Sequence, residues 1–95
     1  MALKVLSTPS FDRVVKKMYV RDKKVVDQAV TDVAADPSIG EEKKGDLAGV
    51  FVYKFKINKQ EMLLAYRLQP SRDKPHEMVL LNIGSHENFY DAMKR

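Results

Sequence analysis

The stretch Val50–Ile57, which reads VFVYKFKI, constrains the fold more than any other part of the chain. It follows Gly49 and is rich in β-branched and aromatic residues, the composition of a β-strand. Strand geometry divides it between two faces: Phe51, Tyr53, Phe55 and Ile57 on one, and Val50, Val52, Lys54 and Lys56 on the other. The aromatic face must be buried, so we expect a central strand whose lysine-bearing face is uncovered. The two lysines either point at water, as most surface lysines do, or bind an anion.

The composition is that of one small folded domain spanning residues 1–95. Hydrophobic residues make up 44% of the chain and charged residues 32%, which argues against disorder. There is no cysteine, no apolar run long enough to cross a bilayer and no secretory signal, so we expect a cytoplasmic protein without disulfides and without a membrane partner. The net charge of +4 and the pI near 9.4 suggest a polyanionic partner or an acidic protein.

The first 36 residues predict a strand followed by a helical hairpin. Leu3–Leu6 reads as the strand, and Thr8 caps a helix whose first position is Pro9. Helical spacing gives each helix an apolar stripe: Phe11, Val14, Val15, Met18 and Tyr19 in the first, and Val25, Val26, Ala29, Val30, Val33 and Ala34 in the second. We expect Asp22 to cap the second helix, which should end by Asp36 because Pro37 follows.

Basic residues crowd this hairpin. The stretch from Leu3 to Lys24 contains seven lysines and arginines but only two aspartates. These basic residues form either a solvated helix face or a surface that binds RNA phosphates. The candidate RNA-binding residues are Lys16, Lys17, Lys23 and Lys24, with Arg72 in the polar connection Gln69–Glu77.

The second half of the chain predicts three consecutive strands and a short helix. Ser38–Gly49 reads as a loop, and Val50–Ile57 forms a hairpin with Glu61–Leu68 through Asn58, Lys59 and Gln60. The apolar Met78–Ile83 belongs inside the sheet, Gly84 closes it, and Ser85 caps a helix over His86–Lys94. The fold class is therefore α+β, with the order β-α-α-β-β-β-α, a four-stranded antiparallel or mixed sheet, and the helical hairpin packed on one face.

The segment Gly84–Tyr90, GSHENFY, carries the candidate chemistry. His86 and Tyr90 stand at i and i+4, and we expect them beside the uncovered sheet face with Lys54, Lys56 and Arg67. An imidazole can exchange protons near neutral pH, the cations can stabilise a phosphorane, and an aromatic ring can stack on a base. Alternatively, His86 only caps a helix and Tyr90 only packs beneath it. His76 lies a whole strand away from His86, so we expect neither a metal site nor a cofactor.

The chain resembles the RelE/ParE superfamily of toxins from bacterial toxin–antitoxin modules. The order of elements carries the resemblance, together with the segments DLAGVFVYKFKI, LLAYRL and NIGSHENFYDAMKR. It implies a small cytoplasmic endoribonuclease that cleaves mRNA, usually on the ribosome, by attack of the 2′-hydroxyl without a metal. It also implies a cognate antitoxin that neutralises the toxin by covering its surface.

The resemblance assigns roles to single residues. Lys54 and Lys56 match the paired lysines of the RelE strand, one of which is proposed as general base there. His86 and Tyr90 match the C-terminal histidine and aromatic of histidine-bearing relatives, which implies that His86 is a general acid or base, and Tyr66 matches a structural tyrosine. Leu63 stands where RelE carries a phosphate-binding arginine, and Arg67 lies about 13 Å further along the same strand face. The second RelE arginine is replaced by His86, so the chain is closer to the histidine-bearing branch.

Two other functions remain open. A ParE-type toxin with the same fold would inhibit DNA gyrase by protein contact, although such relatives usually lack the histidine and lysine set. A non-catalytic RNA- or protein-binding module would use the basic hairpin alone, and its binding would weaken steeply with salt.

Overall fold

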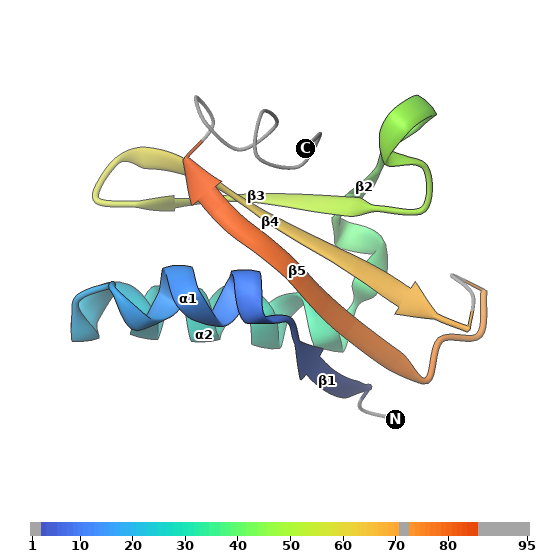
Figure 1. Ribbon diagram of the computed structural model, residues 1–95, viewed down its shortest axis with the longest axis horizontal. Helices are drawn as coiled ribbons and strands as arrows, with labels where there is room; N and C mark the ends of the chain where they lie inside the picture. The colour runs from blue at the N-terminus through green and yellow to red at the C-terminus, as the bar shows by residue number, and fades with distance from the viewer. Residues whose placement is uncertain (1–2, 71–72, 86–95) are drawn as a thin grey trace.

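The computed structural model describes residues 3–70 and 73–85, which form two helices packed against a five-stranded sheet (Figure 1). The strands lie in the order β1-β5-β4-β3-β2; β1 runs parallel to β5, and the other pairs are antiparallel. The elements are β1 (Lys4–Ser7), α1 (Pro9–Lys16), α2 (Val20–Ala35), η1 (Pro37–Ile39), β2 (Glu41–Glu42), η2 (Gly45–Leu47), β3 (Phe51–Ile57), β4 (Gln60–Gln69) and β5 (Glu77–Ser85). The predicted α+β class and mixed sheet are confirmed, with one strand more than expected.

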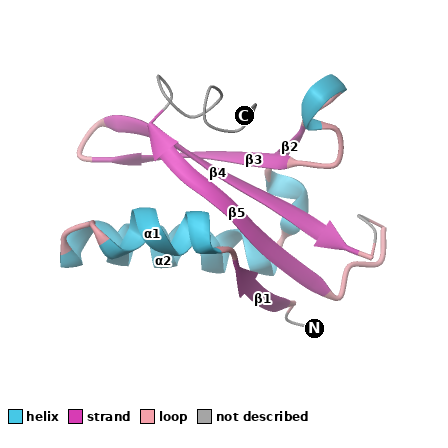
Figure 2. Ribbon diagram, viewed as in Figure 1, coloured by secondary structure: helices cyan, strands magenta, loops and turns pink. Residues whose placement is uncertain are grey.

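The extra strand comes from the segment that the sequence predicted to be a loop. Glu41 and Glu42 form β2, which pairs with Val52 and Phe51 at the outer edge of β3. Two 3₁₀ turns flank it (Figure 2). A two-residue strand of glutamates has no apolar alternation, so periodicity could not reveal it. Because β2 takes up the outer edge, β4 rather than β3 is the middle strand.

Thr8 joins the first helix to the sheet. Its Oγ1 accepts a hydrogen bond from the Phe11 N–H at 3.3 Å, which confirms the predicted N-cap. The same hydroxyl lies within 3.0 Å of the carbonyl oxygens of Leu80 and Leu81 in β5. One side chain therefore fixes both the start of α1 and its position on the strand that pairs with β1.

The turn between the helices differs from the prediction. α2 begins at Val20 with Tyr19 as its N-cap residue, so Asp22 lies inside the first turn and does not cap it. Tyr19 is 77% exposed and does not belong to the buried stripe of α1. The reason is that α1 ends at Lys16 with Lys17 as its C-cap, and beyond a helix end the helical spacing no longer applies. The predicted end of the second helix is confirmed, because α2 stops at Ala35 before Pro37.

The β3–β4 hairpin closes through a two-residue turn. Asn58 and Lys59 both have positive φ, 51° and 70°, as a type I′ turn requires. Ile57 pairs with Gln60, which fixes the register of the whole hairpin.

β5 runs further than predicted. It continues through Gly84, which pairs with Leu63, to Ser85, which pairs with Met62. Gly84 therefore does not close the strand, and Ser85 lies in a strand rather than at a helix cap. The predicted helix His86–Lys94 lies outside the described residues.

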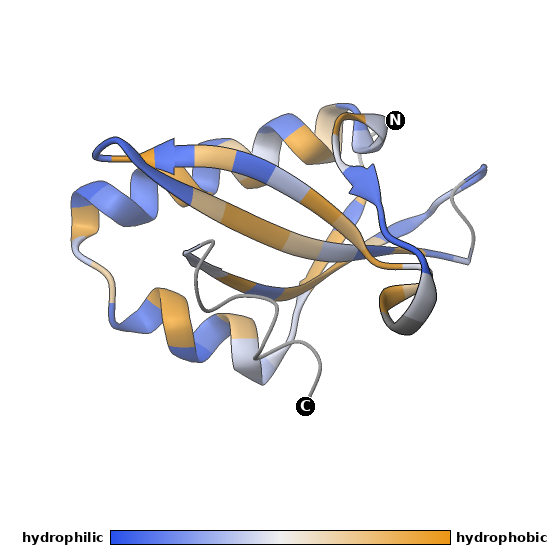
Figure 3. Cartoon of the chain, turned by 90° about the horizontal axis from the view of Figure 1, so that it is seen from above, coloured by the Kyte–Doolittle hydropathy of each residue, from blue (hydrophilic) through white to orange (hydrophobic). Residues whose placement is uncertain are grey.

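The two faces of the sheet differ in what covers them. The helix-covered face holds the main core, whose buried members are Phe11, Val26, Val33, Phe51, Ile57, Met62, Leu64, Tyr66, Met78, Leu80 and Ile83. The opposite face, called the distal face below, carries a smaller buried cluster of Val50, Val52, Leu63 and Ala65. Figure 3 shows hydrophobic and hydrophilic residues alternating along both helices, as expected for helices with one face on a sheet.

No helix in the described part of the chain has the length and apolar character needed to span a bilayer.

Candidate active site

Lys54 and Lys56 stand on the distal face of β3, and both are exposed. The strand alternates as predicted, with Phe51 and Ile57 buried in the helix-covered core. Lys54 pairs with Leu63 in β4, and Leu63 pairs in turn with Gly84 in β5. This row of three residues links the lysine to the C-terminal end of the last described strand. Neighbouring strands lie about 4.8 Å apart, so the row is roughly 10 Å wide.

The centre of the distal face is apolar rather than basic. Leu63 and Ala65 have no exposed surface, and Val50 and Val52 are at most 3% exposed. Leu47 and Leu81 pack against this cluster. We expected an uncovered face that gathers positive charge, whereas the lysines occupy only one end of a buried apolar patch. Patches of this kind place cationic groups beside a surface that excludes water, which strengthens their interaction with an anion.

Arg67 shares the distal face but lies at its other end. It is four residues from Leu63 along β4, or about 13 Å. Its guanidinium lies against Gly49, where an added Cβ would come within 3.2 Å of Nη1. It also lines an open cavity of about 320 Å³ with Glu42 and Gln69. The structure therefore brings Lys54 and Lys56 together and leaves Arg67 apart from them.

Glu41 and Lys43 lie beside Lys54, and the sequence did not single them out. With Val52 and Lys54 they line a cavity of about 240 Å³ at the β2–β3 edge. Lys43 Nζ lies 2.7 Å from Glu41 Oε1. The hydrogen bond and charge of Lys43, with a further contribution from the charge of Lys54, hold the pKa of the Glu41 carboxyl below its usual value. The sequence offered little reason to select Glu41 and Lys43, since they are two of several charged residues in a long predicted loop, although functional residues often lie in loops.

Lys56 has an acidic neighbour across the hairpin. The register places Glu61 directly opposite it on β4. Opposite charges in such a pair attract, so part of the positive field of Lys56 is neutralised locally. Lys54, opposite the uncharged Leu63, has no such cross-strand partner in β4.

Tyr66 is structural, as the resemblance implies. Its side chain is completely buried, and its ring stacks on Phe51 with centroids 5.5 Å apart. Its hydroxyl donates a hydrogen bond of 2.7 Å to the carbonyl oxygen of Pro37. Burial raises the pKa of this phenol to about 12. A Cβ on Gly40 would collide with the hydroxyl, so this glycine permits the close approach of the β2 segment to β4.

The remaining predicted site residues divide into two groups. His86, Tyr90 and Arg72 lie outside the described residues. Lys16, Lys17, Lys23 and Lys24 lie on the helical hairpin, which covers the other face of the sheet from Lys54 and Lys56 (Figure 1).

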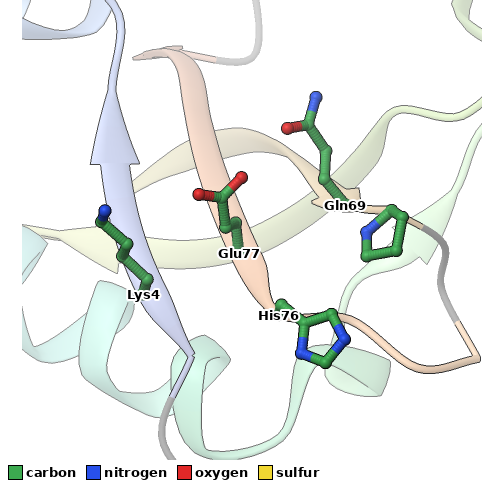
Figure 4. A pocket seen from close by; sticks show the side chains of 5 residues that line it. Lys4, Gln69, His76 and Glu77 are labelled. Carbon is green, nitrogen blue, oxygen red and sulfur yellow. The ribbon is translucent and has the colours of Figure 1, made fainter.

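A larger open cavity, of about 580 Å³, lies at the start of β5 and is lined by Lys4, Gln69, His76 and Glu77. Lys4 and Glu77 are cross-strand neighbours, whereas the imidazole of His76 and the Glu77 carboxylate point in different directions (Figure 4). Among residues 3–70 and 73–85 no three histidine or acidic side chains are grouped so that they could hold a metal ion.

Comparison with known proteins gives a family and a fold. The model of the ParE-like toxins of type II bacterial toxin–antitoxin systems matches residues 5–94. A chain of the RelBE2 toxin–antitoxin complex from Mycobacterium tuberculosis is 24% identical with a TM-score of 0.72, over 90% of this chain and 100% of that one. A mutant of the Escherichia coli toxin RelE in the free state is 18% identical with a TM-score of 0.68, over 100% and 98%. A chain of the intact Escherichia coli RelBE complex is 15% identical with a TM-score of 0.66, over 88% and 96%. No protein of curated function matches the chain.

Proposed function

Because this chain belongs to the ParE-like toxins of type II bacterial toxin–antitoxin systems, we propose that it is a toxin that cleaves mRNA on the ribosome and is neutralised by a cognate antitoxin. The family match and the RelE-like fold confirm the resemblance to the RelE/ParE superfamily. The nuclease activity, the RNA substrate and the residues that act on it are the proposal.

The proposed reaction is cleavage of a phosphodiester bond by the neighbouring 2′-hydroxyl. The 2′-oxygen attacks phosphorus, the bond from phosphorus to the 5′-oxygen breaks, and the products are a 2′,3′-cyclic phosphate and a 5′-hydroxyl. One group must accept the 2′-hydroxyl proton, and another must protonate the leaving 5′-oxygen. Cationic donors must stabilise the extra negative charge on the phosphorane.

The residues at the β2–β3 edge suit these tasks. Lys54 and Lys56 would hold the scissile phosphate and stabilise the phosphorane. Glu41 lies near Lys54, and its carboxylate, which is ionised at neutral pH like that of any exposed glutamate, would accept the 2′-hydroxyl proton. His86 would protonate the leaving oxygen, since imidazole titrates near neutrality. Tyr90 would stack on a base, and Arg67, at the far end of the face, would bind a phosphate further along the RNA.

The observation that supports this proposal most is the row Lys54–Leu63–Gly84. It brings the exposed lysine of β3 and the end of β5 within about 10 Å of each other. His86 is the second residue after Gly84 in the sequence. The proposal is that the side chains of Lys54 and His86 meet on one phosphate across this row.

The test is to map RNA 5′-ends in cells after a brief pulse of expression, for the wild-type chain and for His86→Ala, Lys54→Ala and Glu41→Gln. We expect new mRNA ends and growth arrest with the wild type. Both should be lost with His86→Ala and strongly reduced with Lys54→Ala and with Glu41→Gln. A folded His86→Ala protein that still cleaves RNA would refute the proposed mechanism.

Two results would replace the proposal. Gyrase-linked DNA breaks with intact RNA would identify a gyrase inhibitor. Growth arrest that survives His86→Ala but is lost on charge reversal at Lys16, Lys17, Lys23 and Lys24 would identify a non-catalytic binding module.

A further inference from the structure

The turn between α1 and α2 has a surface that the proposed active site does not use. This hairpin tip, defined as residues 16–24, joins the two helices at the end of the molecule where the β3–β4 turn also lies (Figures 1 and 3). Tyr19 is 77% exposed and Val20 is 70% exposed. Single exposed hydrophobic residues are common on proteins, but these two are far more exposed than the other exposed large hydrophobic residues of the described chain, which lie between 36% and 42%.

Neither residue contributes to packing. Met18, just before them, packs against the helix-covered core, and Val26, further along α2, is a buried core residue. The chain turns between these two anchors, so the fold would tolerate polar side chains at positions 19 and 20. The exposed aromatic ring is therefore available for a ligand.

Positive charge is concentrated around this ring. The chain has 17 lysines and arginines and 13 acidic residues, and residues 16–24 hold five of the former and one of the latter. The rest of the chain is therefore balanced, with twelve of each. The one acidic residue of the tip, Asp22, lies 3.8 Å from Arg21 in an ion pair, and its side chain is only 20% exposed. The net charge of the whole chain is thus equal to that of its hairpin tip.

We infer that the hairpin tip is a second RNA-contact site, in which the ring of Tyr19 stacks on an unpaired base while the surrounding lysines and Arg21 bind the adjacent phosphates. Exposed aromatic rings within a cationic surface are the means by which proteins hold single-stranded RNA. An anionic membrane would also attract the charge, but two side chains give too little apolar surface to hold a bilayer. This inference rests on the proposal that the chain acts on RNA.

The site would bind RNA at a distance from the cleavage site. The helices cover one face of the sheet (Figure 1), whereas Lys54 and Lys56 lie on the other, so the tip and these lysines would contact different parts of a bound RNA. It would hold a structured substrate, such as an RNA loop with unstacked bases, by a part remote from the scissile bond.

The test measures RNA binding by fluorescence anisotropy over a series of salt concentrations, with His86→Ala present in every protein so that the RNA stays intact. The probes are a short single-stranded RNA and a blunt duplex that contains it.

Tyr19→Ala and Tyr19→Leu should each weaken single-strand binding roughly tenfold. Tyr19→Phe should bind like the parent, and duplex binding should not change. Val5→Ala, at an exposed apolar residue of β1, is the control and should bind like the parent. Lys17→Ala should reduce the salt dependence of binding by about one phosphate contact.

Three results would overturn the inference. Unchanged single-strand binding by Tyr19→Ala would exclude stacking. Normal binding by Tyr19→Leu would indicate a simple apolar contact. Tyr19-dependent binding to vesicles of phosphatidylglycerol and phosphatidylcholine, without Tyr19-dependent RNA binding, would assign the tip to a membrane. If Tyr19→Ala has no effect while cleavage in cells still needs His86, only this inference fails. If His86→Ala still cleaves RNA, the proposed mechanism fails, and the Tyr19 comparison is made with a 2′-O-methyl probe, which has no 2′-hydroxyl to attack the phosphate.

Discussion

The two faces of the sheet differ in how they are packed, although adjacent residues of β4 contribute to both. Leu63 and Leu64 are both completely buried, yet Leu64 belongs to the helix-covered core, with eleven buried members among the described residues, and Leu63 to a distal cluster of four. The helix-covered face supplies most of the buried apolar surface. The distal face can therefore carry exposed lysines at its edge without loss of stability.

This division implies that stability and activity can be changed separately. Substitution of residues that pack against the helices should destabilise the protein. Substitution of residues at the charged edge of the distal face should change RNA cleavage or RNA binding. Each prediction below tests one side of this comparison.

The largest expected effect is on the core. Leu64→Ala should lower the free energy of unfolding by about 4 kcal/mol, because helices on one side and strands on the other prevent the cavity from closing. Leu63→Ala should cost about 2 kcal/mol, because the smaller distal cluster can relax around the lost side chain. Urea denaturation of both variants gives the comparison. Equal losses would show that the two clusters are equally rigid and would remove the asymmetry.

The next effect is on chemistry alone. Lys54→Met should slow RNA cleavage about 100-fold, equivalent to about 2.7 kcal/mol of transition-state stabilisation, and should change the free energy of unfolding by less than about 0.5 kcal/mol. Lys4→Met is the matched control, because Lys4 is also an exposed strand lysine but lies in β1. A similar loss of cleavage in both variants would mean that total charge, not the position of Lys54, determines the rate.

Most of the helix-covered face could be predicted from sequence, because alternation and helical spacing report burial directly. The pattern of Val50–Ile57 correctly assigned Phe51 and Ile57 to the core, and the Thr8–Pro9 pair located the start of α1. Tyr19 was placed wrongly because the stripe of α1 was extended past the end of that helix.

The charged edge was less predictable, because it depends on contacts between segments distant in sequence. Glu41 reaches Lys54 only because β2 pairs with β3, and β2 is held near β4 by the hydrogen bond from Tyr66 to Pro37. No local pattern encodes that contact. The lysines themselves were found because they interrupt an otherwise apolar strand.

The Tyr66 contact predicts a dependence of stability on pH. The pKa of its phenol is raised from 10.0 to about 12 in the folded protein, so an unfolded chain ionises first as pH increases. The stabilisation from this group is complete below pH 10 and is lost as pH rises through about 12, a change of about 3 kcal/mol. Thermal unfolding followed from pH 9 to 12 should show this loss. Tyr66→Phe should lack this component, whereas Tyr53→Phe, at a half-buried tyrosine of the same core, should retain it.

The smallest expected effects are those of Glu61→Gln on the free energy of unfolding and on RNA affinity. Glu61→Gln removes the carboxylate opposite Lys56 and should lower the free energy of unfolding by only about 0.5 kcal/mol, as for other cross-strand charge pairs. The same change frees the ammonium group of Lys56 from a competing anion, so affinity for RNA should increase by a similarly small factor, about twofold. Anisotropy measurements at low salt, where surface charges are least screened, are the sensitive assay. A substitution that weakens the fold and strengthens binding together is expected only on a face whose charges serve a ligand; if RNA affinity falls instead, Glu61 orients Lys56 for binding and the pair acts as one unit.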